Sequence, residues 1–435
     1  MMRILFLTQI VPYPPDAGPK VKTWHVIRYF CELGHEVSLA TFVRPEEEQH
    51  LAVLEELCHQ VFAVPFKRSK IEDFGYLIRS LFSGRPFLVE RDNLKRMRNL
   101  VDELLTHQEI DAIHADQLTM TQYALPHHAQ FKSNDLGNAN LVSEVSHPLR
   151  IFDAHNAVYK ILERMSGNLP WYLRPFANFE ARKIKQFEGK IVTEFDHTLS
   201  VTENDRIALL SAVDSRVNGK IQVEPAISVV PIAVNPNEIS PVQLQEKSRT
   251  ILTLGSLHYP PNADGIRWFI EQVYPRIRGK KPDANLTIIG KNPPADFIQF
   301  AEQNPEHVSV TGYAPDLEPY LKDTSVLVIP VRAGGGMRVR ILEGLAYGQA
   351  IVTTTVGLEG IEAKSGKEVL VADEPQDFAE AVLELMNNFE LRCEIAKNGR
   401  DLIERKYDWQ VVLKKVKDIY QEFELKNQGF VPNVE

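Results

Sequence analysis

The sequence Pro330-Val-Arg-Ala-Gly-Gly-Gly-Met-Arg-Val-Arg-Ile-Leu-Glu-Gly-Leu-Ala-Tyr-Gly348 combines a strand end, a glycine loop and the start of a helix. The run 325–330 is short, β-branched and closed by proline, which predicts a buried parallel strand ending at a loop. The glycines at 334–336 let the backbone turn sharply and let a ligand approach the main chain. Apolar residues then recur at helical spacing over 337–346, and Gly348 is a plausible helix stop.

The charges in this stretch point to an anionic ligand. Arg338 and Arg340 lie in the first turns of the predicted helix, where the helix dipole disfavours cations and favours anions. A diphosphate over the glycines would account for both arginines. Glu343 lies one turn later, where a carboxylate can accept hydrogen bonds from ribose hydroxyls. The alternative is an ordinary glycine turn with solvated arginines and a surface-paired glutamate, but the order of these features favours the ligand.

Length, charge and cysteine content limit the class of protein. A chain of 435 residues is long enough for two or three domains. Its formal charge of −9 argues against a general nucleic-acid binder, which needs a basic face. Three widely separated cysteines indicate neither a disulfide framework nor a Cys-x-x-Cys metal site. The apolar core of residues 1–12 is too short for a signal peptide, and no stretch reaches the roughly 18 apolar residues of a membrane span. We therefore expect a cytoplasmic protein.

The first half of the chain alternates strands and helices. Strand 3–8, a loop over 11–18, a helix to about 33 and strand 36–42 form a right-handed unit with parallel strands. Ligands of such sheets bind at the carboxyl ends of the strands, which here is the loop at Gly18. Lys20 and Lys22 follow this loop, either to bind a phosphate or as solvated helix lysines. Further strands are predicted at 61–66, 111–114, 149–154, 197–201 and 227–231.

Two surface segments stand out in this half. Residues 67–98 are rich in lysine and arginine among apolar side chains, and helices are predicted near 70–82 and 93–107. Two interpretations stay open: a basic amphipathic helix on the inner face of a membrane, or a solvated helix over the core. Residues 129–148 are polar and patternless, which predicts a surface insertion.

His155 and Asn156 follow a predicted strand directly, at the edge where the fold rule places chemistry. Imidazole can exchange protons or hydrogen bonds with a sugar hydroxyl near neutral pH, so we favour function over a structural histidine. After a polar linker at 235–249 the strand and helix pattern begins again, with strands at 250–255, 285–290, 308–312, 350–354 and 368–371. Helices are predicted at 262–279 and near 375–388, 390–406 and 408–426.

The chain as a whole resembles the family-four glycosyltransferases, retaining enzymes of the GT-B fold. The motifs that carry the resemblance are Pro12 to Gly18, Asp153 to Asn156, Ser200 to Asp205, Gly255 to Asp264, Gly334 to Glu343 and Val356 to Gly360. The Gly334 motif is similar to the signature Gly-Gly-Gly-x-Arg-x-Lys/Arg of one bacterial branch. Many family members carry two glutamates eight positions apart; Glu343 matches the second, and Gly335 stands in place of the first. The loop 256–262 also lacks the family's arginine and lysine, so we infer that Arg338 and Arg340 supply that charge.

The resemblance implies two Rossmann-like, doubly wound α/β domains facing across a cleft. An acceptor-side domain would span 1–236, completed by helix 408–426 crossing back, and a donor domain 249–407. The donor-binding residues expected from the resemblance are Gly18, Gly290, Tyr313, Gly334, Gly335, Gly336 and Glu343. His155, Arg338 and Arg340 are expected to be catalytic, with Lys20 and Asn156 on the acceptor side.

The implied activity is retaining transfer of a sugar from a nucleotide-diphosphate sugar to a glycan or lipid-linked acceptor. Polysaccharide or cell-envelope glycan assembly is the implied setting. No carboxylate stands out as a nucleophile, so we expect front-face transfer, in which the leaving diphosphate takes the acceptor's proton. No Asp-x-Asp motif is present in the expected site, and we expect no cofactor and no essential metal. The alternatives are a GT-B nucleotide-sugar epimerase and a catalytically silent nucleotide-sugar binding subunit.

Overall fold

The computed structural model describes residues 1–125, 147–167, 169–213, 216–217, 220–221 and 224–427. The chain divides into two compact units. Unit 1 comprises Met1–Val230 with Leu413–Glu435, and unit 2 comprises Pro231–Val412. The insertion predicted at 129–148 lies almost wholly outside the described residues. No helix in the described part of the chain is long and apolar enough to cross a membrane.

Unit 1 is built on a seven-stranded parallel sheet in the order β3-β2-β1-β4-β5-β6-β9. Chain order reverses between β1 and β4, and the carboxyl ends of strands at such a switch point are where open α/β sheets bind ligands. The strands are β1 Arg3–Thr8, β2 Glu36–Val43, β3 Gln60–Pro65, β4 Ala112–Asp116, β5 Leu149–Ala154, β6 His197–Ser200 and β9 Ile227–Val229.

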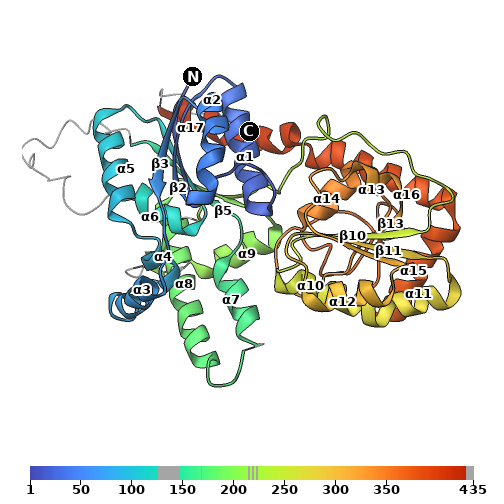
Figure 1. The fold of residues 1–435 in the computed structure, drawn as a ribbon. Helices are drawn as coiled ribbons and strands as arrows, with labels where there is room; N and C mark the ends of the chain where they lie inside the picture. Colours follow the sequence, from blue (N-terminus) through green and yellow to red (C-terminus); the bar gives the residue numbers. More distant parts are fainter. Residues whose placement is uncertain (126–146, 168, 214–215, 218–219, 222–223, 428–435) are drawn as a thin grey trace, which may run out of the picture. The chain divides into compact units, whose positions relative to one another are not determined.

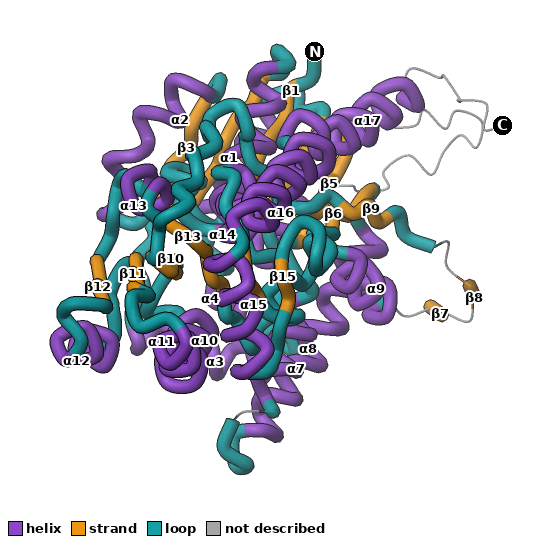
Figure 2. The backbone as a smooth tube through the Cα atoms, turned by 90° about the vertical axis from the view of Figure 1, so that its right-hand side faces the viewer, coloured by secondary structure: helices purple, strands orange, loops and turns teal. Residues whose placement is uncertain are grey.

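Helices cover both faces of this sheet (Figure 1). Because strand side chains alternate between faces, Leu5 and Ile113 enter one core while Phe6 and His114 enter the other. The second core also holds Phe30 of α1 and Tyr420 of α17, whose rings lie 4.6 Å apart, so α17 runs beside α1 (Figures 1 and 2). The helices of unit 1 are α1 Gly18–Glu32, α2 Leu51–Leu57, α3 Lys70–Ser83, α4 Phe87–Arg91, α5 Lys95–His107, α6 Thr121–Ala124, α7 Val158–Ser166, α8 Arg174–Glu194 and α9 Glu203–Ala212, with α17 Trp409–Asn427 completing it from residue 413.

Glu188 of α8 is a fully buried carboxyl group in unit 1. It accepts hydrogen bonds from the backbone N–H groups of Val158 (2.7 Å) and Tyr159 (3.1 Å) at the start of α7. Burial raises the pKa of Glu188 from 4.5 to about 8, and the nearby Asp205 adds to the rise, while the two backbone hydrogen bonds lower it. Between these two pKa values, the folded chain therefore keeps a proton on Glu188 that the unfolded chain has released.

The stability of unit 1 is accordingly expected to fall as pH rises from about 5 to about 8. Glu188→Gln keeps the shape of the side chain but cannot ionise, so its free energy of unfolding should vary less over that range. Urea unfolding of both proteins at several pH values measures the difference. Glu203→Gln, on the exposed surface of α9, is the control, and its free energy of unfolding should change with pH as the wild type's does. The same change with pH in wild type and Glu188→Gln would rule out the titration of Glu188.

Unit 2 contains a six-stranded parallel sheet in the order β12-β11-β10-β13-β14-β15. Its switch point lies between β10 and β13, whose carboxyl ends precede Gly255 and the glycine loop. The strands are β10 Thr250–Leu254, β11 Asn285–Ile289, β12 Val308–Thr311, β13 Thr324–Ile329, β14 Ile351–Thr353 and β15 Leu370–Val371. Strands β10 and β13 are buried, as the apolar runs predicted.

Helices also cover both faces of the second sheet (Figure 1). The single helix predicted at 262–279 is interrupted by a wider π turn, Phe269–Val273. Pro275 has no N–H to donate four residues back, and the π turn accommodates the missing bond. The helices of unit 2 are α10 Pro260–Trp268, α11 Tyr274–Lys280, α12 Ala295–Gln303, α13 Glu318–Lys322, α14 Val339–Ala346, α15 Pro375–Asn387 and α16 Phe389–Leu402, followed by a second π turn at Ile403–Tyr407.

Candidate active site

The glycine loop in unit 2 adopts a backbone that requires glycine. Gly334 has a φ of +105° and Gly336 a φ of +81°, in the left-handed region that other residues rarely enter. The loop joins β13 to α14, which begins at Val339. Gly335 and Gly336 are partly exposed and Gly334 is exposed, so the main chain here is accessible. The predicted strand, glycine turn and helix are therefore present.

Arg338 occupies the N-cap position of α14 and folds back over this loop. Its Nη1 donates hydrogen bonds to the carbonyl oxygens of Gly335 (2.6 Å) and Gly336 (3.0 Å). The side chain therefore fixes the shape of the loop and also places positive charge at a helix N-terminus. The sequence predicted the charge but not the structural contact.

Arg340 and Glu343 form an ion pair in the first turns of α14. Nη1 of Arg340 lies 2.6 Å from Oε2 of Glu343, and both side chains stay partly exposed. They lie on the wall of a cavity of about 90 Å³, whose other walls are mainly apolar. The sequence assigned these two residues to separate ligand groups, a diphosphate and a ribose, whereas here they contact each other. A ligand hydroxyl would therefore meet a preformed pair of donor and acceptor. The remaining lining residues are Ile239, Leu254, Leu317, Leu321, Leu327, Gly344 and Tyr347.

Gly290 and Tyr313, the residues expected near a base, lie beyond β11 and β12. A side chain at Gly290 would meet the carbonyl oxygen of Gly255 at 1.9 Å, so packing alone requires glycine there. Tyr313 is exposed, and Nζ of Lys291 lies 4.6 Å from its ring centroid. An exposed aromatic ring is available for stacking, but nothing about Gly290 requires a ligand.

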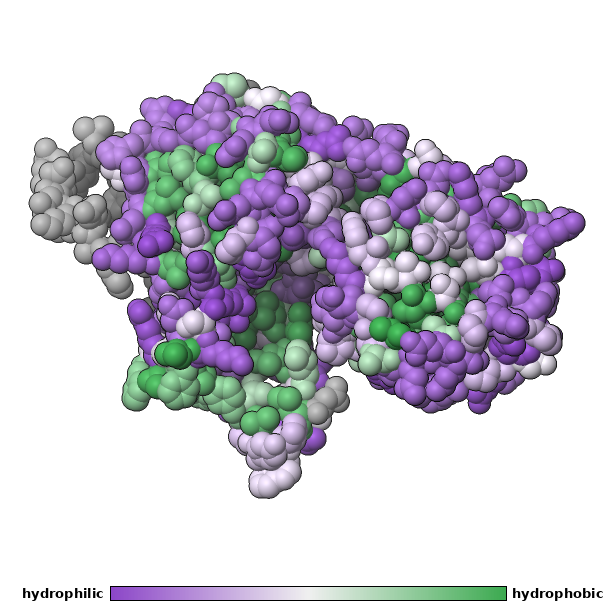
Figure 3. Space-filling model, viewed as in Figure 1, coloured by the Kyte–Doolittle hydropathy of each residue, from purple (hydrophilic) through white to green (hydrophobic). Residues whose placement is uncertain are grey.

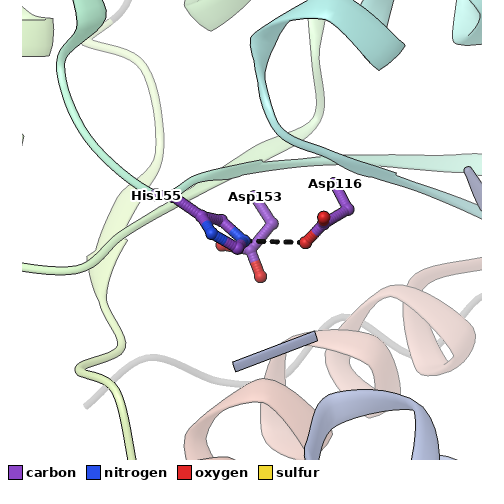
Figure 4. Close-up of side chains that lie close together, drawn as sticks. All are labelled: Asp116, Asp153 and His155. Atoms are coloured by element: carbon purple, nitrogen blue, oxygen red, sulfur yellow. Dashed lines mark hydrogen bonds and ion pairs between the residues drawn. The ribbon is translucent and has the colours of Figure 1, made fainter. Parts of the chain in front are cut away.

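In unit 1, His155 follows the carboxyl end of β5 and contacts the end of β4 (Figure 4). Its Nε2 lies 2.7 Å from Oδ1 of Asp116, which also accepts a hydrogen bond from Thr23 Oγ1 of α1 at 3.0 Å. Asp116 is 1% exposed, and its Oδ2 has no hydrogen-bond partner in the described part of the chain. A carboxylate in this position fixes the ring orientation of His155 and favours a proton on Nε2.

A second buried carboxylate, Asp153, lies beside this pair. Lys22 of α1 forms an ion pair with Asp153, and His114 Nε2 lies 3.3 Å from Asp153 Oδ2. Tyr420 of α17 is the last member of this series of side-chain contacts, with its hydroxyl 2.7 Å from His114 Nδ1. Burial alone would raise the pKa of Asp153, but the Lys22 ammonium and the contacts with His114 and His155 outweigh it and hold the pKa below its usual range. Lys22 is thus neither of the predicted alternatives: it is 2% exposed and its charge is taken up by Asp153.

Asp116, Asp153 and His155 each place one ligand atom within 4.8 Å of the others, a spacing at which they could hold a metal ion. Lys22 already provides a cation on the Asp153 side of this cluster. The hydrogen bonds and ion pairs of this cluster form a network that orients His155.

The remaining predicted residues lie near the start of α1 and the end of β5. Gly18 is the first residue of α1, and the N-cap residue, Ala17, makes no side-chain capping hydrogen bond. Lys20 is mostly buried and lies 3.7 Å from Glu47 and 3.9 Å from Asp16, so it is not a simple solvated lysine. Asn156 is partly exposed directly after His155. Unit 1 thus brings His155 together with residues 22–23, while the arginines and Glu343 belong to unit 2.

Comparison with known proteins matches part of the chain to a family model. Residues 248–388, which include the glycine loop and Glu343, match the family model described as "Glycosyl transferases group 1". The matched segment marks the chain as a glycosyltransferase. The glycosyltransferase is also 21% identical over 423 residues to an uncharacterized 44.6 kDa protein in the cps region of Klebsiella pneumoniae, covering 96% of this chain and 99% of that relative.

Solved structures with the GT-B fold resemble this glycosyltransferase along nearly its whole length. Sucrose-phosphate synthase from Thermosynechococcus elongatus matches 98% of this chain and 100% of its own, with 13% identity and a TM-score of 0.66. Anabaena HepE in complex with UDP-glucose matches 97% of this chain and 100% of its own, with 12% identity and a TM-score of 0.63. The glycosyltransferase therefore has the predicted α/β GT-B fold, with two parallel Rossmann-like sheets and C-terminal helices. The donor-loop signature of one bacterial branch stays a prediction.

Proposed function

We propose that this glycosyltransferase moves a sugar from a nucleotide-diphosphate sugar to a glycan or lipid-linked acceptor, with retention of configuration, in polysaccharide or cell-envelope glycan assembly. The observation that carries the proposal is the Gly334–Glu343 loop and helix start, which lies inside the segment matching the group 1 family. Two comparisons support it: HepE was solved with UDP-glucose, and the Klebsiella relative comes from a cps region.

In this proposal the donor binds unit 2. The diphosphate lies over Gly335 and Gly336, where accessible backbone, a helix N-terminus and the Arg338 guanidinium combine. Glu343 binds the ribose hydroxyls, and Arg340, its ion-pair partner, turns toward the diphosphate. The exposed ring of Tyr313 stacks on the base.

The acceptor groups belong to unit 1, around Gly18, Lys20, His155 and Asn156. In front-face transfer the bond from the anomeric carbon to the diphosphate oxygen breaks. The new bond to the acceptor oxygen forms on the same face, and the acceptor proton passes to the leaving diphosphate. His155 hydrogen-bonds to a sugar hydroxyl, in an orientation fixed by Asp116. Arg338 and Arg340 supply the charge that stabilises the diphosphate as it leaves, so no essential divalent ion is required.

A thermal-shift panel with UDP, GDP, ADP and their sugars tests the donor site. A ligand at about 100 times its dissociation constant should raise the free energy of unfolding by roughly 2.7 kcal/mol. Glu343→Ala removes a charged hydrogen-bond acceptor, which should weaken affinity by about tenfold and so remove about half of that stabilisation. Asp296→Ala is the matched control, because it breaks an exposed ion pair of the same unit, Arg267–Asp296 at 2.7 Å.

Full stabilisation of wild type and Asp296→Ala by one nucleotide family, with clearly less stabilisation of Glu343→Ala, would support the donor site. No stabilisation by any of these ligands would contradict it. Release of nucleoside diphosphate in the presence of an acceptor extract then separates the activities. Binding without release points to a silent subunit, in line with the glycine at position 335, and conversion of the sugar without acceptor points to an epimerase.

A further inference from the structure

One end of unit 1 carries a concentrated apolar surface. Eleven of the twenty exposed large hydrophobic side chains in the described residues come from two places: α3, and the stretch from the end of α7 through the first turns of α8. They give this end of unit 1 its green area over α3 and α8 in Figure 3. We call this the α3–α8 surface; its apolar members are Ile71, Phe74, Ile78, Leu81, Phe82, Met165, Trp171, Tyr172, Leu173, Phe176 and Phe179.

Helix α3 presents its apolar side to solvent instead of to the core. Phe82 is 87% exposed, Ile71 86% and Phe74 64%, whereas the one buried residue of the helix is Ser80. A helix that only covers a core has the opposite orientation, with its apolar stripe inward. The interpretation of α3 as a solvated helix over the core is therefore wrong.

Polar contacts on the inner side hold α3 in this orientation. Lys183 of α8 is buried, and its Nζ donates to Ser80 Oγ (2.6 Å), Ser80 O (3.3 Å) and Arg85 O (3.2 Å). Glu180, also buried, lies 2.7 Å from Lys183 and accepts a hydrogen bond from the Phe87 backbone N–H. Buried charges that are paired and hydrogen-bonded fix geometry, because breaking one contact exposes the others. These buried contacts therefore fix the orientation in which the apolar stripe of α3 faces solvent.

The same surface is basic in an acidic protein. Residues 67–91 contain six lysines and arginines against three acidic residues, and residues 158–185 contain six against two. These segments together carry a net charge of +7 in a chain whose total is −9. A second copy docking through the same patch would bring two such positive surfaces together, which disfavours a dimer.

We propose that the α3–α8 surface binds the anionic phospholipid surface of a membrane. Outward aromatic and aliphatic side chains would enter the boundary between headgroups and acyl chains, with Trp171 and Tyr172 at the polar–apolar interface where these residue types are enriched. The basic residues around them would meet anionic headgroups. This proposal does not depend on the donor-site assignment, because vesicle binding is measured without donor or acceptor.

Vesicle flotation with the full-length protein tests the proposal. One set of vesicles is pure phosphatidylcholine, and the other contains one part phosphatidylglycerol to two parts phosphatidylcholine. The wild type should float with the anionic vesicles, and raised salt should release it. Phe74→Ser/Phe82→Ser should weaken binding by at least about tenfold, and Lys67→Gln/Lys70→Gln by about fivefold for each charge removed.

The control is Leu33→Ser/Ile298→Ser, which removes two exposed apolar side chains outside the α3–α8 surface and should float like the wild type. This control separates binding through the α3–α8 surface from nonspecific adsorption of any exposed apolar side chain. Absence of wild-type flotation, equal flotation of all variants, or equal binding to neutral vesicles would overturn the proposal. A wild-type dimer that ignores vesicles and dissociates in Phe74→Ser/Phe82→Ser would also overturn it, and would assign the surface to contact between copies.

Discussion

Replacing Arg338 by alanine is expected to lower kcat for sugar transfer by about 10²–10³-fold, the usual loss when a preorganised donor to developing negative charge is removed. Two effects combine at this residue. Its guanidinium carries positive charge at the N-terminus of α14, and the same group bridges the carbonyl oxygens of Gly335 and Gly336. Steady-state release of nucleoside diphosphate measures kcat, and nucleotide titration measures donor affinity.

Two further variants separate charge from loop geometry. Arg338→Lys keeps the charge but lacks the planar donor pair, so its activity should lie between wild type and Arg338→Ala. Arg332→Ala is the control: this exposed arginine pairs with Asp264 at 2.9 Å just before the glycines, and its loss should affect kcat little. The assignment fails if Arg338→Ala and Arg340→Ala both keep wild-type donor affinity.

The sheets could be predicted from sequence because buried parallel strands have a simple signature. Short β-branched runs such as those of β10 and β13 are apolar on both faces, and they alternate with helical segments along the chain. Residues 158–166 form α7, a helix that was missed. This short helix has a clear amphipathic periodicity, which could have predicted it. Strand β4 also runs two residues past the predicted end at His114, to Asp116.

The site was predicted less completely because contacts between distant residues leave no local pattern. Lys22 and Asp153 are 131 positions apart, and their pairing follows from the packing of α1 against the sheet. Asp116 was missed for the same reason, although an acidic residue at the carboxyl end of a strand beside the switch point is a usable signal. The Arg340–Glu343 pair could have been foreseen, since residues three apart on a helix are neighbours.

Lys22→Met is expected to lower the free energy of unfolding of unit 1 by about 3–5 kcal/mol, the range for removing one partner of a buried ion pair. Lys22 is 2% exposed and Asp153 fully buried, so no water is available to replace the ammonium. Urea unfolding at neutral pH measures the loss. Lys20→Met is the control, because Lys20 lies on the same helix but its ion-pair distances are 3.7 and 3.9 Å, and its loss should stay below about 1 kcal/mol.

The pH dependence of that loss distinguishes an uncompensated charge from a packing defect. In the wild type the pKa of Asp153 is held below its usual value, so its contribution is present above the unfolded pKa of 3.8 and is lost as pH falls. Without Lys22, burial dominates and raises the pKa of Asp153, so Lys22→Met loses stability as pH rises. The difference in free energy of unfolding between wild type and Lys22→Met should therefore narrow as pH falls toward about 5. Lys22→Met/Asp153→Asn removes both charges and should recover most of the stability. A gap that stays constant with pH, or a double variant no more stable than Lys22→Met, would show that packing around the methylene chain, and not the ion pair, makes Lys22 necessary.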